Sequence, residues 1–400
     1  MKEIVIIGAG ASGMAAAIMA AKNPENHVTL LERQARVGRK LLSTGNGRCN
    51  LTNIGAGLEN YHGEAPKFVL PALQKYSPER VLEFFEQLGL KTVTEYGGRV
   101  YPMSDHAGSV LDVLRLALEK PNISLRTGVT AENASRHGAG FRVTAGEETL
   151  FADRLIVACG GCAGSKLGGV MDGYNLLKAL GHSRTALYPS LTQLRTVPDY
   201  PKAMKGIKAE ATLRLLDRER VLAEATGDGL FTETGLSGTA VFEISRFVSG
   251  SERLTASLCF FRETEDVLLE ELLQRKQLWP EQAANTILTG TVQSRLGAML
   301  CKYAEISGGE QIADLTESRL RRLARAMVDF RLPITGVSGF ESAQVTAGGI
   351  RTAEIDPHTM GSRLVPGLYV CGELLDVDGD CGGFNLQWAW ASGLMAGELG

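Results

Sequence analysis

Two glycine-rich segments at opposite ends of the chain have the residue types and spacing to bind an anionic ligand. Gly8, Gly10 and Gly13 form a G-x-G-x-x-G pattern between an apolar run and a helix-forming run. The first glycine allows a tight turn, the second lets the backbone approach a pyrophosphate, and the third lets the helix pack closely on the strand. Near the C-terminus, Gly382 and Gly383 precede an apolar segment whose helical start would offer free N–H groups and a partial positive charge. The two ends are therefore predicted to build one site.

An acidic residue and a basic loop refine the class of ligand. Glu32 ends the strand-like run that follows the first helix, where a carboxylate accepts hydrogen bonds from a ribose 2′-OH. This position favours FAD or NAD over NADP. Residues 33–53 then form a basic, glycine-punctuated loop, where an NAD dehydrogenase would continue alternating strands and helices. We expect Arg39 and Lys40 near phosphates and residues 45–50 near a ring system, which favours FAD.

The elements that must position these residues follow an α/β pattern. The predicted fold is a Rossmann-like FAD-binding domain with a parallel sheet, a β-meander in place of one crossover helix, and an inserted cap. The expected sheet strands are residues 3–7, 27–31 and 154–158, the meander spans 123–151, and helices span 78–88 and 109–118.

The cap is predicted to have a β-rich part followed by a helical part. A helix is expected within residues 239–248 of the β-rich part. In the helical part, Thr264 and Thr316 are expected to cap helices, and Pro280 to occupy a first helical position. The predicted boundaries are 1–188 and 336–400 for the FAD-binding domain, 189–262 for the β-rich part and 263–335 for the helical part.

Length and composition limit the possible partners. The 400 residues, 44% apolar and 22% charged, are typical of a folded protein with more than one domain. A net charge of −3 with dispersed basic residues argues against nucleic acid and favours a small-molecule substrate. Seven cysteines without regular spacing and the lack of a signal-peptide core predict a cytoplasmic protein, and no apolar run suggests a membrane span. The scattered histidines predict no metal site, and the oligomeric state is left open.

Several longer segments carry a family resemblance over nearly the whole chain. They are residues 40–53, 98–102 (Gly-Arg-Val-Tyr-Pro), 172–174 (Asp-Gly-Tyr), 345–350 (Val-Thr-Ala-Gly-Gly-Ile) and 365–393. The chain resembles a bacterial family of FAD-dependent oxidoreductases labelled aminoacetone oxidase-like or 3-dehydro-bile-acid Δ4,6-reductase-like. More distantly, it is similar to the flavoprotein subunits of fumarate reductase and to tRNA-modifying flavoproteins.

The resemblance implies FAD in an extended pose. The pyrophosphate would lie at the first glycine motif, the adenosine ribose at Glu32, the adenine at Val129, and the ribitol along Gly372 and Glu373. Residues 383–386 would lie under the pyrimidine edge of the flavin, where a helix start stabilises the negative charge of the reduced ring. The predicted FAD-binding residues are Gly8, Gly10, Ala11, Ser12, Gly13, Glu32, Arg33, Arg39, Lys40, Leu41, Gly45, Arg48, Cys49, Asn50, Val129, Ala158, Gly160, Gly161, Gly372, Glu373, Gly383, Phe384, Asn385 and Leu386.

Catalytic residues are less clearly indicated, because in flavin chemistry the cofactor carries the reaction. Cys49, Cys381 and Asn385 are the catalytic candidates, since they lie in segments expected near the flavin ring. Cys159 and Cys162 form a C-x-x-C that we interpret as small residues beside FAD, with a redox dithiol as the alternative. The chain has Glu233 where the family has a histidine, so the resemblance does not carry over a substrate.

The expected reaction is a two-electron reduction of an activated C=C bond, driven by NAD(P)H. No second G-x-G-x-x-G pattern is present for a nicotinamide domain, so NAD(P)H is expected to bind transiently. Three alternatives stay open: an amine oxidase that uses O2, a flavin-binding sensor without turnover, and an RNA-modifying flavoenzyme. The balanced charge disfavours the last.

Overall fold

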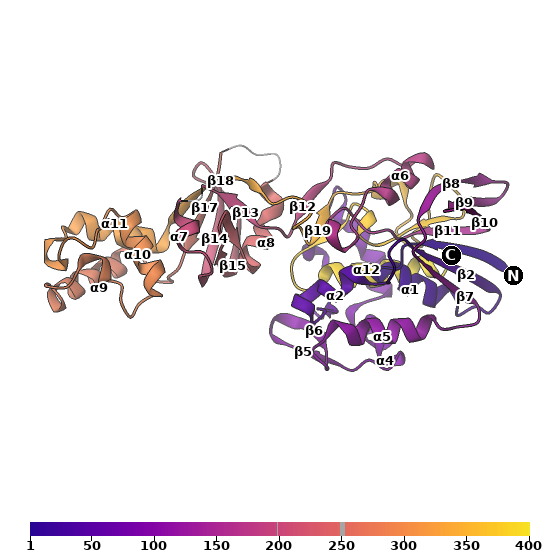
Figure 1. Cartoon of the computed structure of the whole chain (residues 1–400), viewed down its shortest axis with the longest axis horizontal. Helices are drawn as coiled ribbons and strands as arrows, with labels where there is room; N and C mark the ends of the chain where they lie inside the picture. Colours follow the sequence, from indigo (N-terminus) through magenta and orange to yellow (C-terminus); the bar gives the residue numbers. More distant parts are fainter. Residues whose placement is uncertain (198, 249–252) are drawn as a thin grey trace. The chain divides into compact units, whose positions relative to one another are not determined.

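The computed structural model describes residues 1–197, 199–248 and 253–400. The chain forms two compact units (Figure 1). Unit 1 combines Met1–Pro189 with Phe340–Gly400, and unit 2 comprises Ser190–Gly339. Of the inserted parts expected from the sequence, residues 190–335 lie in unit 2, and Pro189 lies in unit 1.

Unit 1 is built on a five-stranded parallel sheet, in which β1 is central. The strands are apolar because helices and loops cover both faces, and residues 4–7 of β1 are buried. In sheet order the strands are β20 (Leu368–Val370), β11 (Arg154–Val157), β1 (Lys2–Ile7), β2 (Asn26–Glu32) and β7 (Ile123–Thr127). The predicted Rossmann-like α/β fold is confirmed.

Helices from both ends of the chain pack against each other in unit 1. These are α1 (Ala11–Ala20) and α12 (Phe384–Gly397). Their close approach depends on glycine: a Cβ on Gly393 would lie 2.4 Å from the carbonyl oxygen of Ser12. The predicted helices over 78–88 and 109–118 are confirmed as α4 (Pro78–Gln87) and α5 (Ala107–Leu118). Unit 1 also contains α2 (Arg39–Ser43), α3 (Leu70–Lys75) and α6 (Asp172–Ala179).

The β-meander of unit 1 begins later than predicted. Its antiparallel strands are β8 (Ala131–His137), β9 (Gly140–Ala145) and β10 (Glu148–Ala152). The first predicted strand of this segment is instead β7, which pairs in parallel with β2 through partners such as Leu30 and Leu125. The assignment of the β7 residues to the meander was therefore wrong, because a local strand pattern does not specify which strand it pairs with.

Unit 2 contains a closed barrel followed in sequence by helices. The barrel strands, in spatial order, are β13 (Leu194–Thr196), β16 (Gly235–Ser237), β15 (Arg220–Phe231), β14 (Lys208–Asp217), β17 (Leu254–Cys259) and β18 (Phe330–Val337). The helix predicted within 239–248 is α8 (Thr239–Ser245) with a short 3-10 turn. The later helices are α9 (Glu265–Leu278), α10 (Ser294–Tyr303) and α11 (Glu317–Val328).

Two of the three predicted helix starts in unit 2 are confirmed. The hydroxyls of Thr264 and Thr316 accept hydrogen bonds from the backbone N–H groups of Val267 and Arg319. Pro280 does not begin a helix. It lies in a turn just after α9, whose last turn closes with the Trp279 N–H donating to the Arg275 carbonyl. Proline is also common shortly after a helix ends, so its position alone did not distinguish a start from a stop.

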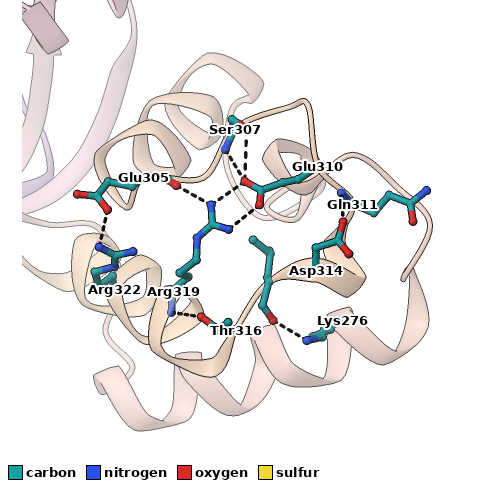
Figure 2. A network of polar contacts seen from close by, with 10 residues as sticks. Lys276, Glu305, Ser307, Glu310, Gln311, Asp314, Thr316, Arg319 and Arg322 are labelled. Carbon is teal, nitrogen blue, oxygen red and sulfur yellow. Dashed lines mark hydrogen bonds and ion pairs between the residues drawn. The ribbon is translucent and has the colours of Figure 1, made fainter.

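A network of polar contacts connects the helices of unit 2 (Figure 2). The Arg319 guanidinium donates to both carboxylate oxygens of Glu310, at 2.5 and 2.6 Å, and to the Glu305 carbonyl at 2.6 Å. The Glu305 side chain pairs with Arg322 at 2.6 Å. Hydrogen bonding to Arg319 lowers the pKa of Glu310 to about 2, so this carboxyl is ionised at neutral pH.

Candidate functional site

The carboxyl ends of three neighbouring strands in unit 1 lead into the glycine segments predicted to bind FAD. Gly8 follows β1, the segment with Ala158 follows β11, and Cys371 follows β20. Gly8 has φ +102°, and a Cβ there would lie 2.5 Å from the Ala158 carbonyl oxygen. In open parallel sheets, ligands bind at this carboxyl edge.

The other two glycines of the first motif have different surroundings. A Cβ on Gly13 would lie 1.8 Å from the Gly8 carbonyl oxygen, so only glycine allows α1 to pack this closely on the turn. A Cβ on Gly10 would meet no atom within 4 Å. Gly10 therefore borders open space, into which a ligand can approach the backbone.

The start of α1 has the properties of an anion-binding site. Gly10 is its N-cap and supplies no side-chain hydrogen bond, and the first turn carries no acidic residue. Free N–H groups and the positive end of the helix dipole therefore face the open side of the turn. The Glu32 carboxylate lies beside this turn and accepts hydrogen bonds from the Ala9 N–H at 3.0 Å and the Gln34 N–H at 2.8 Å. The Val129 N–H donates to the Glu32 carbonyl, which places Val129 next to the predicted ribose position.

An ion pair connects the N-terminal basic loop to the strand end at β20. Lys40 Nζ lies 2.6 Å from Glu373 Oε2, and Glu373 Oε1 accepts a hydrogen bond from the Thr346 N–H at 2.8 Å. A Cβ on Gly161 would lie 2.7 Å from the same carboxylate. Lys40 and Glu373 thus hold predicted FAD-binding segments together across the chain.

The remaining predicted basic residues near this loop contact protein groups. The Arg39 guanidinium donates to Gln34 Oε1 and the Lys166 carbonyl, and that of Arg33 donates to the Gly168 carbonyl. Arg48 pairs with Glu95 and Asp105. Leu41 is buried in the core. Their predicted roles at the cofactor stay predictions.

The start of α12 is a second helix N-terminus without a side-chain cap. Gly383 is its N-cap with φ +105°, and the first turn contains no acidic residue. A Cβ on Gly383 would lie 2.5 Å from the Thr52 carbonyl oxygen, so the segment after the basic loop lies directly against this turn. The Asn385 amide bonds to both backbone groups of Gly379 and to the Asp380 carbonyl, which fixes the preceding loop.

Asn50 supplies an unsatisfied acceptor beside the α12 start. The residue is 9% exposed, and its buried Oδ1 has no hydrogen-bond partner in the described part of the chain. This oxygen lies 2.9 Å from the position of a Cβ on Gly383. An unpaired buried acceptor costs about 1–3 kcal/mol, so a ligand donor is expected there.

These groups fit the pyrimidine edge of a flavin, which carries one N–H between two carbonyl oxygens. The Asn50 oxygen would accept from the flavin N–H, and the free N–H groups of α12 would donate to a flavin carbonyl. With the α1 start available for a pyrophosphate, the residues of unit 1 fit FAD.

Comparisons with known proteins identify the family of this chain. The family described as HI0933-like protein Rossmann domain matches residues 2–399. The chain belongs to this family. It is 39% identical over 405 residues to the 3-dehydro-bile acid delta(4,6)-reductase of Clostridium scindens, covering 100% of this chain and 98% of that protein. It is 29% identical to the ribosomal RNA dihydrouridine synthase of Escherichia coli strain K12, covering 98% and 96% of the two chains.

A solved structure supports the fold over the whole chain. The 3-ketosteroid delta1-dehydrogenase from Sterolibacterium denitrificans superposes with a TM-score of 0.50 at 13% identity, covering 100% of this chain and 99% of that one. The predicted resemblance to bacterial FAD-dependent oxidoreductases is confirmed, and with it the enzyme class.

No helix among the described residues is long and apolar enough to cross a membrane. Those residues also contain no cluster of three or more His, Cys, Asp or Glu that could hold a metal ion.

The cysteines predicted near the flavin differ in their surroundings. All seven cysteines are free of disulfide bonds. Cys49 is fully buried, and burial raises its pKa to about 12. Burial also raises the pKa of Cys159 to about 12, which disfavours its thiolate at neutral pH. Cys381 is partly buried and adjoins the α12 start.

Sequence reasoning missed polar residues that lie close to the α12 start. The short strands β4 (Tyr61–His62) and β21 (Asp378–Gly379) pair there. His62 Nε2 lies 2.6 Å from Asp380 Oδ1, and the Tyr61 hydroxyl donates to the Phe384 carbonyl at 3.0 Å. Arg99, in a segment used only for the resemblance, lies beside Gly382. No local sequence signal identifies these residues, because each is brought to the α12 start from a segment far away in the chain.

Proposed function

We propose that this protein is an FAD-dependent reductase of an activated C=C bond in a small organic substrate. The observation that carries this proposal is the 39% identity, over the full length of both chains, to a 3-dehydro-bile acid delta(4,6)-reductase. The two uncapped helix starts in unit 1 support the cofactor assignment. We also expect a cytoplasmic location, from the cysteine composition.

The residues of unit 1 would bind and orient FAD, which supplies two-electron chemistry when bound. The N–H groups at the start of α1 would hold the pyrophosphate, and Glu32 would accept hydrogen bonds from the ribose. The N–H groups at the start of α12 would stabilise negative charge on the reduced ring. Asn50 would fix the ring orientation through its otherwise unpaired oxygen.

Anaerobic mixing tests both the cofactor and the direction of the reaction. The purified protein is expected to be yellow, and NADPH or NADH should bleach its flavin absorbance. A subsequent addition of a steroid 4,6-dien-3-one should restore the absorbance with formation of reduced steroid. A colourless protein whose stability does not change with FAD would contradict the cofactor assignment.

Other outcomes of the same experiment select the alternatives. Bleaching by an amine such as aminoacetone, with no bleaching by NAD(P)H, would indicate an amine oxidase. A flavin that no donor reduces would indicate a sensor. The absence of a second dinucleotide motif supports transient docking of NAD(P)H, which predicts reduction without a stable complex.

A second candidate is reduction of uridine in ribosomal RNA. It is favoured by the similarity to the E. coli ribosomal RNA dihydrouridine synthase. Against it, the net charge is −3, and arginines of the Arg-rich helix α11 pair with acids, including Arg319 with Glu310 and Arg322 with Glu305 (Figure 2). Such pairing reduces attraction for phosphates. Incubation of unmodified ribosomal RNA with the protein and NADPH, followed by dihydrouridine quantification, distinguishes the two substrates.

A further inference from the structure

Arg99 places a cation beside the proposed flavin edge. It begins strand β6 (Arg99–Pro102) and pairs with Asn53 on β3 (Thr52–Asn53). The residue is partly buried, yet within the described residues its guanidinium has no hydrogen bond or ion pair. A partly buried arginine without such an acceptor can bind an acceptor on a ligand.

Arg48 provides a contrast on the same surface. Its guanidinium pairs with Glu95 and Asp105 and lies 3.9 Å from the centre of the Tyr101 ring. Arg48 therefore pairs with two carboxylates, whereas no carboxylate in the described part of the chain forms an ion pair with Arg99. Tyr101 lies two residues after Arg99 on β6, so both side chains extend from the same face of the strand.

The position of Arg99 is set by the loop that starts α12. Its Nε lies 3.7 Å from the position of a Cβ on Gly382. Asn53, its cross-strand partner, donates from Nδ2 to the Gly382 carbonyl at 3.0 Å. Gly382 immediately precedes the N-cap of α12, where Asn50 presents its unpaired oxygen. Arg99 therefore lies beside the groups that fit the flavin ring, on the side of Gly382.

From this arrangement we propose that Arg99 binds the carbonyl oxygen of an α,β-unsaturated carbonyl substrate and stabilises the enolate formed during reduction. The inference rests on the proposed function and adds the substrate class and the residue that recognises it. The guanidinium offers fixed N–H donors, which suit an oxygen that gains negative charge.

In the proposed reduction, the β carbon gains a C–H bond while the C=C π bond breaks and its electrons move toward the carbonyl oxygen. Reduced FAD, when bound, would supply the hydride. The resulting enolate oxygen accepts hydrogen bonds from Arg99. A proton from water then bonds to the α carbon, the C=O bond reforms, and the substrate has gained two electrons and two protons.

Phenolate binding tests this recognition without turnover. Phenolates resemble enolates and give a long-wavelength charge-transfer band when they stack on oxidised flavin. Titration of the yellow wild-type protein with p-chlorophenol should give this band. The R99A variant, with unchanged FAD content, should bind the phenolate at least about tenfold more weakly, as expected for a lost charge-assisted hydrogen bond. R99K should fall between them, because it keeps the charge without the planar fork.

The matched control is R142A, because Arg142 is exposed on β9, in the meander of unit 1. It should bind phenolate as the wild type does. Equal phenolate affinity of R99A and wild type, or no band with the yellow wild type, would overturn the inference. Loss of FAD from both R99A and R99K would place Arg99 in the cofactor site instead and would also overturn it. A colourless wild-type protein is a failure of the proposed function.

Kinetic measurements show whether Arg99 binds the carbonyl of the substrate or a carboxylate elsewhere on it. For R99A, the rate of flavin reoxidation by a 4,6-dien-3-one should fall by about tenfold or more at saturating substrate, while reduction by NADPH is unchanged. The loss should be the same for a neutral steroid enone and one bearing a side-chain carboxylate. An effect confined to the KM of the carboxylated compound would overturn the assignment to the carbonyl.

Discussion

Cys49 combines complete burial with a left-handed backbone, φ +63°, in the loop that lies against α12. Its backbone N–H donates to the Thr44 carbonyl, which closes the turn that contains Gly45 and Asn46. Burial raises the pKa of its thiol to about 12. At the scale of single residues, Cys49 therefore packs as a neutral thiol, and its catalytic role stays a prediction.

This environment predicts low reactivity. At pH 8 the folded protein should incorporate almost no iodoacetamide at Cys49, because the reactive thiolate is scarce and access is blocked. Mass spectrometry of tryptic peptides measures labelling, and the same protein labelled after denaturation is the control. Rapid labelling of Cys49 in the folded protein would instead show an accessible thiolate and would favour a nucleophilic role.

At the scale of elements, the pair of α1 and α12 forms the structural core of the proposed site. Each helix begins at a glycine without a side-chain cap, and the two pack through small residues. Trp388 and Trp390 on α12 are buried, and their indole N–H groups donate to the carbonyls of Gly372 and Leu51. The C-terminal helix thus fixes both the β20 strand end and the basic loop.

Substitution of Gly393 tests this packing. In G393A, the new Cβ would lie 2.4 Å from the Ser12 carbonyl oxygen, which forces α1 and α12 apart. We expect the free energy of unfolding to fall by about 2 kcal/mol, together with weaker FAD retention. Chemical denaturation and flavin absorbance measure the two effects. G309A is the control, because its nearest neighbour, Ser307 Oγ, lies 4.0 Å away; equal stability of both variants would contradict the packing argument.

The Glu310–Arg319 pair predicts a defined pH dependence for the helices of unit 2 (Figure 2). The pKa of Glu310 falls from 4.5 to about 2 on folding. The stabilisation of the fold by its carboxylate is therefore fully present above pH 4.5 and is lost as the pH falls through about 2. The difference in Tm between wild type and E310Q should therefore be largest near neutral pH and shrink over this window. A difference that does not change with pH would mean that the carboxylate charge is not the cause.

At the scale of the whole molecule, the two units have separate hydrophobic cores. The first contains the parallel sheet with α1 and α12, and the second contains the barrel with α9, α10 and α11. All residues predicted to hold FAD lie in unit 1. Cofactor binding should therefore stabilise the units unequally.

Hydrogen exchange measures this difference directly. Addition of FAD to apo-protein should slow amide exchange at residues 8–13 and 383–386 and leave α9–α11 of unit 2 unchanged. FMN lacks the adenosine half and should protect residues 8–13 less than FAD does. Protection centred on α9–α11 would contradict the placement of the cofactor.

The sequence by itself determined the features that depend on local chain geometry. The first glycine motif, the acid at Glu32, the strand β1 and the caps at Thr264 and Thr316 follow from backbone requirements within a few residues of each position. Tertiary structure alone decided which distant strands and side chains contact each other. It paired β7 with β2 and joined Lys40 to Glu373. Among the described residues, it also left Asn50 Oδ1 without a hydrogen bond beside the α12 start. Such contacts join residues far apart in the chain, and no local pattern specifies whether a polar group finds a protein partner or is left to meet a ligand.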